Sequence, residues 1–396
     1  MSKLLKLFFI LFVLNSCTKS KSIQRLENPT SENSSLPRLF TDNTGTVFMS
    51  WVEQRNELAT LKYSKFVDNK WLEPVVISES KEWFVNWADF PSVIAQNGGP
   101  VAAHWLKKIP GNAYSYNVEI TAHSEGSFID PIVPHTDNTA TEHGFVSMNP
   151  VSDSSFYAIW LDGRNTSGGH GEHGDLSSAM TLRGAEISRS GTVMDEQEID
   201  PAICDCCNTS ITNSPGGLLA VYRDRTEEEI RDVYITKMEN GTWNKPKAVF
   251  NDHWEIAACP VNGPSIDSFN STVAVAWYTG ANNNPAVKLA FSADEGNSFF
   301  APILIDTKSS LGRVDVLMND EHSAWISWMS RTEESAQLNL QLVSQNGEIK
   351  KSHIVSAMSP SRSSGFPQIT RTKDGVLIAW TDHSESEMKV NTAILR

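Results

Sequence analysis

The 396-residue sequence is short of basic charge, of cysteine and of long apolar stretches. Its 33 Lys and Arg residues stand against 47 Asp and Glu residues, and the formal net charge of -14 argues against a nucleic-acid-binding surface, which needs a basic field. The apolar run at residues 7–14 is too short for a spanning helix, which needs about 20 apolar residues. The remaining composition, 40% hydrophobic and 20% charged, is that of a globular protein rather than a disordered or multi-span membrane protein.

Helical periodicity is absent as well, and a longer repeat takes its place. Seven short apolar segments each end in an aromatic residue, and turn residues bound them as they bound strands. The segments are residues 47–51, 101–105, 156–160, 218–222, 273–277, 324–328 and 376–380. Their spacing of 51 to 62 residues predicts an all-β fold, a β-propeller of four-stranded blades. We expect seven blades, the last closed by a strand from residues 22–26; six blades with one peripheral unit is the alternative.

The N-terminal segment resembles a bacterial lipoprotein signal. Lys3 and Lys6 precede the apolar run, and Leu14-Asn15-Ser16-Cys17 is similar to a lipobox. The resemblance implies a signal peptide at residues 1–16, a lipidated Cys17, a tether at 17–36 and a propeller at 37–396. Because Thr18 is not the Asp that often marks inner-membrane retention, we expect an outer-membrane lipoprotein facing the periplasm. The alternative is an ordinary secretory signal with an incidental cysteine.

One turn resembles a known repeat family. The stretch from Ser292 to Phe299, Ser-Ala-Asp-Glu-Gly-Asn-Ser-Phe, is similar to the Asp-box of the sialidase superfamily, S-x-D-x-G-x-x-W/F. An Asp side chain at this position can bond the hairpin backbone, and the Gly suits a corner with positive φ. The resemblance implies a sialidase-like propeller, but it concerns the fold alone, because the Asp-box lies on the face opposite the ligand site.

We expect the functional site on the face where the outer strand of each blade leads into the inner strand of the next blade. Loops between the second and third strands of the blades open on the same face, and such loops carry function. Charged and polar residues gather in these predicted connections. The expected ligand-binding residues are Arg164, Arg225, Asn262 and Arg362.

The cysteines give the sharpest signal in these connections. Cys204, Cys206 and Cys207 lie at one joint and Cys259 at the next, so the topology makes them neighbours. Structural disulfides would suit an oxidising envelope compartment. A thiolate metal site is the second interpretation, with Cu(I) or Zn as the ion and His143 or His253 as an added ligand. A redox-active pair is the third.

The sialidase resemblance also suggests catalytic candidates. Enzymes of that family place three Arg on a carboxylate and use an acid/base Asp and a Tyr nucleophile paired with Glu. The matching candidates are Asp89, Glu142, Arg223, Tyr222 and Arg313, with Arg38 as another Arg and Tyr278 as another Tyr. However, the family's Arg-Ile-Pro start is absent, and a cysteine cluster is foreign to that mechanism.

These observations favour a lipid-anchored envelope propeller that binds a small molecule, a glycan or a thiolate-bound metal through Arg, acidic and Cys groups on one face. The alternatives are a sialidase-like exo-glycosidase acting on an acidic sugar and a non-enzymatic assembly scaffold. The expected partners are the membrane, through Cys17, and the ligand; the oligomeric state is left open.

Overall fold

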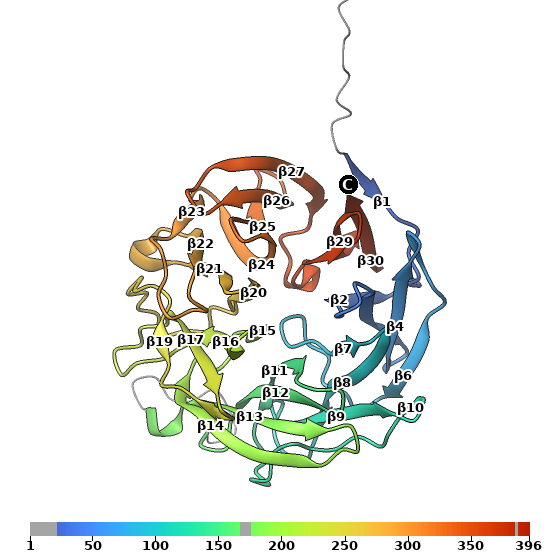
Figure 1. Cartoon of the computed structure of the whole chain (residues 1–396). Helices are drawn as coiled ribbons and strands as arrows, with labels where there is room; N and C mark the ends of the chain where they lie inside the picture. Colours follow the sequence, from blue (N-terminus) through green and yellow to red (C-terminus); the bar gives the residue numbers. More distant parts are fainter. Residues whose placement is uncertain (1–21, 167–175, 385–386) are drawn as a thin grey trace, which may run out of the picture.

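Seven blades stand in a ring around a central channel in the computed structural model (Figure 1). The structure describes residues 22–166, 176–384 and 387–396, so Cys17 and the signal segment lie outside the described residues. The predicted all-β propeller and the favoured number of seven blades are confirmed. Within the described ranges, no helix has the length and apolar character needed to cross a bilayer.

Each blade is an antiparallel sheet whose strands run in order from the channel outwards. The first blade contains β2 (Ser34–Thr41), β3 (Val47–Arg55), β4 (Leu58–Val67), β5 (Lys70–Trp71) and β6 (Val75–Ser80). The second contains β7 (Ser92–Gln96), β8 (Gly99–Lys108), β9 (Tyr116–Ser124) and β10 (Ser127–Phe128). The third contains β11 (His143–Pro150), β12 (Ser155–Asp162), β13 (Met180–Ser188) and β14 (Val193–Ile203).

The remaining four blades repeat this order. The fourth contains β15 (Ser210–Ser214), β16 (Gly217–Arg223), β17 (Val233–Glu239), β18 (Thr242–Trp243) and β19 (Lys247–Ala248). The fifth contains β20 (Ser265–Phe269), β21 (Thr272–Thr279), β22 (Ala286–Ser292) and β23 (Ile303–Asp306). The sixth contains β24 (Ser310–Asp320), β25 (Ser323–Arg331), β26 (Ala336–Ser344) and β27 (Ile349–Met358). The seventh contains β28 (Gln368–Thr372), β29 (Gly375–Ser384), β30 (Glu387–Leu395) and β1 (Ile23–Arg25). Short 3-10 helices η1 (Leu176–Ser178), η2 (Ala281–Asn283) and η3 (Arg362–Ser364) lie in connections.

The ring closes by a strand borrowed from the N-terminal end. β1 pairs antiparallel with β30, and Ile23 lies opposite Leu395 (Figure 1). This pairing confirms the predicted closure and covers an edge that would otherwise expose unpaired backbone groups. Residues 34–36, which were predicted to belong to the tether, form the start of β2 in the first blade.

The core lies between the blades. Seven apolar clusters each join two neighbouring blades, so every blade packs on both sides. The aromatic residues of the sequence repeat belong to these clusters or to the strands beside them, and the six tryptophans among them are at most 5% exposed. They are Trp51, Trp105, Trp160, Trp277, Trp328 and Trp380. Each buries on the order of 150–250 Å² of mostly apolar surface, which accounts for the repeat in the sequence.

The two ends of the channel differ. We call the end that carries the joints between blades (residues 86–91, 129–142, 204–209, 249–264 and 359–367) the joint face, and the opposite end the turn face. Near the joint face the channel narrows to a cavity of about 40 Å³ beside Phe145 and Phe366. Toward the turn face it widens to about 500 Å³. The turn from Ser292 to Phe299 lies between β22 and β23 on the turn face.

Candidate functional site

Three cysteines lie together where β14 leaves the third blade. The backbone N–H of Cys204 donates to the carbonyl of Arg223 at 3.0 Å, which fixes the start of the joint. The chain then turns back, so that the Sγ atoms of Cys204, Cys206 and Cys207 all lie within 4.8 Å of one another. The Sγ of Cys204 is 2.9 Å from that of Cys207 and 4.0 Å from that of Cys206. All three side chains are buried free thiols.

Cys259 completes the group from the next joint. It is an exposed free thiol beside Cys206, close enough that the Cys206 thiol lowers the pKa of Cys259. The two joints can approach because of Gly263: a Cβ atom there would lie 2.0 Å from the backbone oxygen of Asn208. The structure thus brings together the four cysteines that the topology predicted to be neighbours. We call Cys204, Cys206, Cys207 and Cys259 the cysteine cluster.

Buried charged residues surround the cysteine cluster. Arg225 lies 3.5 Å from Asp205 and 2.8 Å from Glu229, and Arg231 lies 2.6 Å from the other oxygen of Glu229. Burial alone would raise the pKa of Cys204, but hydrogen bonds from the other two buried thiols and the charge of Arg231 bring it well below its ordinary value. The site therefore stabilises a thiolate at Cys204.

Arg223 does not present its guanidinium group to a ligand, contrary to the role expected for it. The side chain is 2% exposed and donates to the carbonyl oxygens of Asn262 and Tyr278, each at 2.8 Å, and of Arg231. Its guanidinium carbon also lies 4.8 Å from the ring centroid of Trp254. Asn262 is occupied too, because its side-chain oxygen accepts from the Arg313 N–H at 2.8 Å. Both residues hold neighbouring blades together.

Two of the expected catalytic acids meet at a tyrosine that sequence reasoning missed. The hydroxyl of Tyr116 donates to Glu142 at 2.5 Å and lies 3.5 Å from Asp89. Burial raises the pKa of Asp89 to about 7 and that of Glu142 to about 8. Tyr116 is 1% exposed and stacks on Phe84.

The pairing expected for Glu142 with Tyr222 or Tyr278 is not formed. Tyr222 donates to Asp200 at 2.6 Å within the fourth blade, and Tyr278 packs against Trp254. Glu142 remains close to the cysteine cluster, since the charges of Asp205 and Cys259 contribute to its raised pKa.

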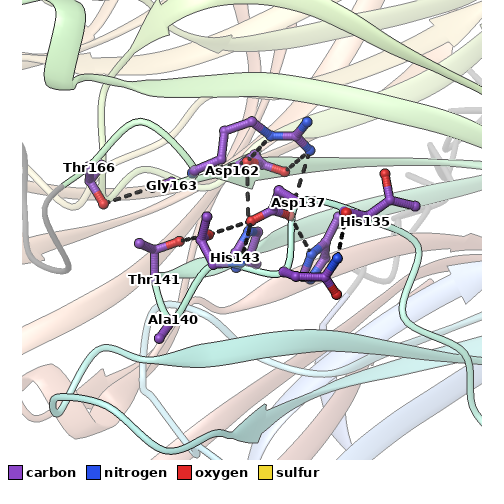
Figure 2. Close-up of polar contacts among 12 residues, drawn as sticks. His135, Asp137, Ala140, Thr141, His143, Asp162, Gly163 and Thr166 are labelled. Carbon is purple, nitrogen blue, oxygen red and sulfur yellow. Dashed lines mark hydrogen bonds and ion pairs between the residues drawn. The ribbon is translucent and has the colours of Figure 1, made fainter.

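His143 belongs to a second group and not to the cysteine cluster. It lies with His135 and Asp162 around the carboxylate of Asp137 (Figure 2). Arg164, expected as a ligand-binding residue, donates to both oxygens of Asp162, at 2.7 and 2.8 Å, and so forms an ion pair beside this group. We call His135, Asp137, His143 and Asp162 the histidine–aspartate cluster.

A cationic and aromatic corner also lies on the joint face. The guanidinium carbons of Arg313 and Arg362 are 5.1 and 5.9 Å from the ring centroid of Trp87, which stacks on Phe366. Burial and the charge of Arg362 lower the pKa of Arg313 to about 10. In the part of the chain that the structure describes, no carboxylate forms an ion pair with either arginine.

Comparisons with known proteins show the fold. No family model matches the chain, and no curated protein matches it. A protein of unknown function from Dyadobacter fermentans DSM 18053 is similar over 95% of this chain and 98% of its own, with 11% identity and a TM-score of 0.52. The polysaccharide lyase Uly1 is similar over 89% of this chain and 88% of its own, with 9% identity and a TM-score of 0.50.

A more distant solved structure is a sialidase. Hadza microbial sialidase Hz136 is similar over 75% of this chain and 63% of its own, with 14% identity and a TM-score of 0.42, which is too weak to carry a structural argument. The propeller fold is thus shared with proteins that include polysaccharide-degrading enzymes, and at these identities the likeness concerns the fold alone. The resemblance of the Ser292–Phe299 turn to the Asp-box stays a prediction.

Proposed function

We propose that the protein binds a thiophilic metal ion, Cu(I) or Zn²⁺, on its joint face through the cysteine cluster. The observation that carries the proposal is the convergence of the three buried thiols within 4.8 Å, with Cys259 beside them. Thiolate sulfur is the donor that both ions prefer, and four cysteines match the coordination number of a closed zinc site. Because Cys259 is exposed, the site is open to metal exchange from the solvent side.

The charges around the cysteine cluster support a metal–thiolate centre. Arg223, Arg225 and Arg231 bring three guanidinium groups to the joint, where Asp205 and Glu229 pair with Arg225 and Arg231. Glu142 lies nearby, but burial raises its pKa to about 8, so it adds little negative charge near neutral pH. Bound thiols lose their protons, so a centre with several thiolates is negative overall. The surplus positive charge of the arginines offsets that negative charge in a buried site where water screens little.

Elemental analysis with thiol counting tests the proposal. Protein purified without chelator should contain at least one Cu or Zn per chain, and its thiols should react with an alkylating reagent only after chelation. Cys207→Ser and Cys259→Ser should lower the metal content, while Cys17→Ser, the same change outside the cluster, should leave it unchanged. Metal-free protein whose thiols are already oxidised would replace the proposal with structural disulfides, and metal-free protein with reactive thiols would favour a redox pair.

We also propose that Cys17 is lipidated and anchors the propeller to the outer membrane, facing the periplasm. The lipobox-like sequence supports the anchor. Cys17→Ser should release the folded protein from the membrane fraction into the soluble periplasm. Retention in the membrane fraction would contradict the anchor, and digestion by protease added to intact cells would contradict the periplasmic orientation.

A second candidate function is recognition of an acidic saccharide at the cationic corner. The observation that favours it is the pair Arg313 and Arg362 on the ring of Trp87, because a guanidinium group binds carboxylate or sulfate and an indole stacks on a sugar ring. A uronic-acid oligosaccharide should bind, and Arg362→Ala should weaken that binding at least about tenfold, as expected for loss of a charged hydrogen bond. Equal binding of the carboxyl-reduced oligosaccharide would rule this candidate out.

A further inference from the structure

A second set of metal-ligand side chains lies where the joint before β11 meets the end of β12. His135 and Asp137 belong to the joint, His143 is the first residue of β11, and Asp162 is the last residue of β12. Figure 2 shows the carboxylate of Asp137 between the imidazole of His135 and the side chains of His143 and Asp162. The proposed thiolate site uses none of these residues.

The distances within the histidine–aspartate cluster suit a small metal ion. Asp137 Oδ1 is 2.9 Å from His135 Nδ1, and Asp137 Oδ2 is 3.2 Å from His143 Nε2. His143 Nε2 is also 3.7 Å from Asp162 Oδ1. Ligands bound to zinc at 2.0–2.1 Å in a tetrahedron are separated by about 3.3 Å, within the range of these values. The two imidazole rings stack in parallel with centroids 3.7 Å apart, so both turn a nitrogen to the same carboxylate.

The buried nitrogens of His143 point to a missing ligand. His143 is 0% exposed, yet neither ring nitrogen makes a hydrogen bond with the described residues. Its Nε2 faces the carboxylates of Asp137, at 3.2 Å, and Asp162, at 3.7 Å, without the geometry of a hydrogen bond. Buried polar atoms without partners are rare in native proteins, and a metal ion bound between the imidazole and the carboxylates would supply the partner.

Charge and orientation support the same conclusion. Among the described residues, the carboxylates of Asp137, Asp162, Glu196 and Glu198 outnumber the two guanidinium groups that pair with them, those of Arg164 and Arg183. The carboxylates are also held in place, Asp137 by the Thr139 N–H at 3.0 Å and Asp162 by Arg164, as the outer partners of a metal site hold its ligands.

We infer that His135, Asp137 and His143, with Asp162 beside them, form a second metal site that takes a borderline divalent cation such as Zn²⁺. Imidazole and carboxylate donors suit Zn²⁺ and its neighbours in the first transition row, whereas the cysteine cluster suits softer ions. The two sites therefore differ in ligand chemistry, and each can be removed without altering the ligands of the other.

Zinc binding to a chain without the thiolate site tests the inference separately from the proposed function. A variant with Ser at all four positions of the cysteine cluster should still bind one Zn²⁺ per chain in competition with a chelator. Adding His143→Gln should lower that affinity at least about 100-fold, because loss of an outer partner alone costs 10–100-fold. His104→Gln, which removes another buried imidazole, should leave the affinity unchanged. A folded four-serine chain that binds no Zn²⁺, or equal affinity with and without His143, would overturn the inference.

Cobalt titration of the unmodified chain provides a readout that does not depend on the variants folding. Co²⁺ at the thiolate site gives a sulfur-to-metal charge-transfer band, and Co²⁺ bound by nitrogen and oxygen does not. Two equivalents should bind, only one of them with the charge-transfer band. Saturation at one equivalent that carries the whole charge-transfer band would contradict a second site, whether or not the proposed function holds.

Discussion

On the turn face, charged side chains such as that of Asp294 are exposed and bond the backbone of a single turn. On the joint face, charged side chains are buried. Asp294 is exposed and accepts from the Ser298 N–H at 2.8 Å, so it spans a single hairpin. Arg225 and Arg231 on the joint face are at most 2% exposed and share Glu229 between them. Burying charge in this way seldom adds to stability, so the buried charge is consistent with the proposed metal site on the joint face.

The backbone shows the same contrast. Positive φ on the turn face falls on Gly296, Glu295 and Asn270, of which Gly and Asn tolerate it best. On the joint face it also falls on asparagines such as Asn138, but it includes Phe145 and Val261, with φ of 53° and 47°. Bulky and β-branched residues disfavour this conformation by on the order of 1–3 kcal/mol, so the surrounding contacts must impose it. Strain of this kind gathers at functional sites.

The largest expected effect comes from breaking the buried ion pairs. Arg231→Met leaves the charge of Glu229 short of one partner and should lower the free energy of unfolding by about 3–5 kcal/mol. Lys237→Met, which removes the partner of Glu295 at the turn face, should lower it by about 1 kcal/mol at most. Urea denaturation of the metal-free proteins gives both values, and equal losses would erase the contrast between the faces.

The pH dependence of stability should have opposite signs at the two faces. The folded-state pKa of Asp89 is raised to about 7, so the unfolded chain ionises first and stability falls as pH rises from about 4 to about 7. The upper limit of this loss is on the order of 4 kcal/mol. The pKa of Asp294 is lowered by hydrogen bonds from Ser298, so its contribution is present above about pH 4 and is lost as pH falls.

Denaturation curves of metal-free protein between pH 4 and 8 check this prediction. Asp89→Asn keeps the acceptor for the Phe145 N–H and should flatten the decline. Asp294→Asn should instead reduce stability near neutral pH relative to acid. A steeper decline in Asp89→Asn would show that the carboxyl group is ionised in the folded protein.

A smaller effect is expected where the two joints approach. Gly263→Ala places a Cβ 2.0 Å from the Asn208 oxygen and should lower stability by about 1–3 kcal/mol. It should also move Cys259 from Cys206 and weaken metal binding. Gly45→Ala on the turn face, where a Cβ meets nothing within 4 Å, should leave metal binding unchanged. Full metal affinity in Gly263→Ala would show that Cys259 is not a ligand.

The smallest expected effect is loss of the hairpin bond on the turn face. Asp294→Ala removes the acceptor for the Ser298 N–H and should lower stability by about 1 kcal/mol, with metal content unchanged. Thermal unfolding and elemental analysis of the same sample measure both. Loss of metal in this variant would mean that the two faces are coupled through the blades.

Features set by repetition could be predicted from the sequence. The aromatic spacing predicted the blades, the incomplete last unit predicted the borrowed strand near Ile23, and consecutive joints predicted Cys259 beside the other three cysteines. Each of these depends on strand order alone, which a period of about fifty residues specifies.

The side-chain contacts made by residues of the irregular joints could not be predicted from the sequence. Glu142 pairs with Tyr116 because the joint before β11 runs beside β9, where Tyr116 N–H donates to Thr141. His143 contacts Asp137, and Asp137 contacts His135, because the same joint places residues 135–137 beside the start of β11. No periodic pattern marks these loops, so residue type identified candidates such as His143 and Arg223 but not the atoms they contact.

Native mass spectrometry of the protein purified from its own envelope tests the central claim most directly. The claim is that the cysteine cluster holds a soft metal ion and not disulfides. We predict a mass that exceeds that of the metal-free chain by at least one Cu or Zn, and the thiols should be in reduced form once chelation has removed the metal. A metal-free mass lower by two hydrogens for each disulfide would contradict the account.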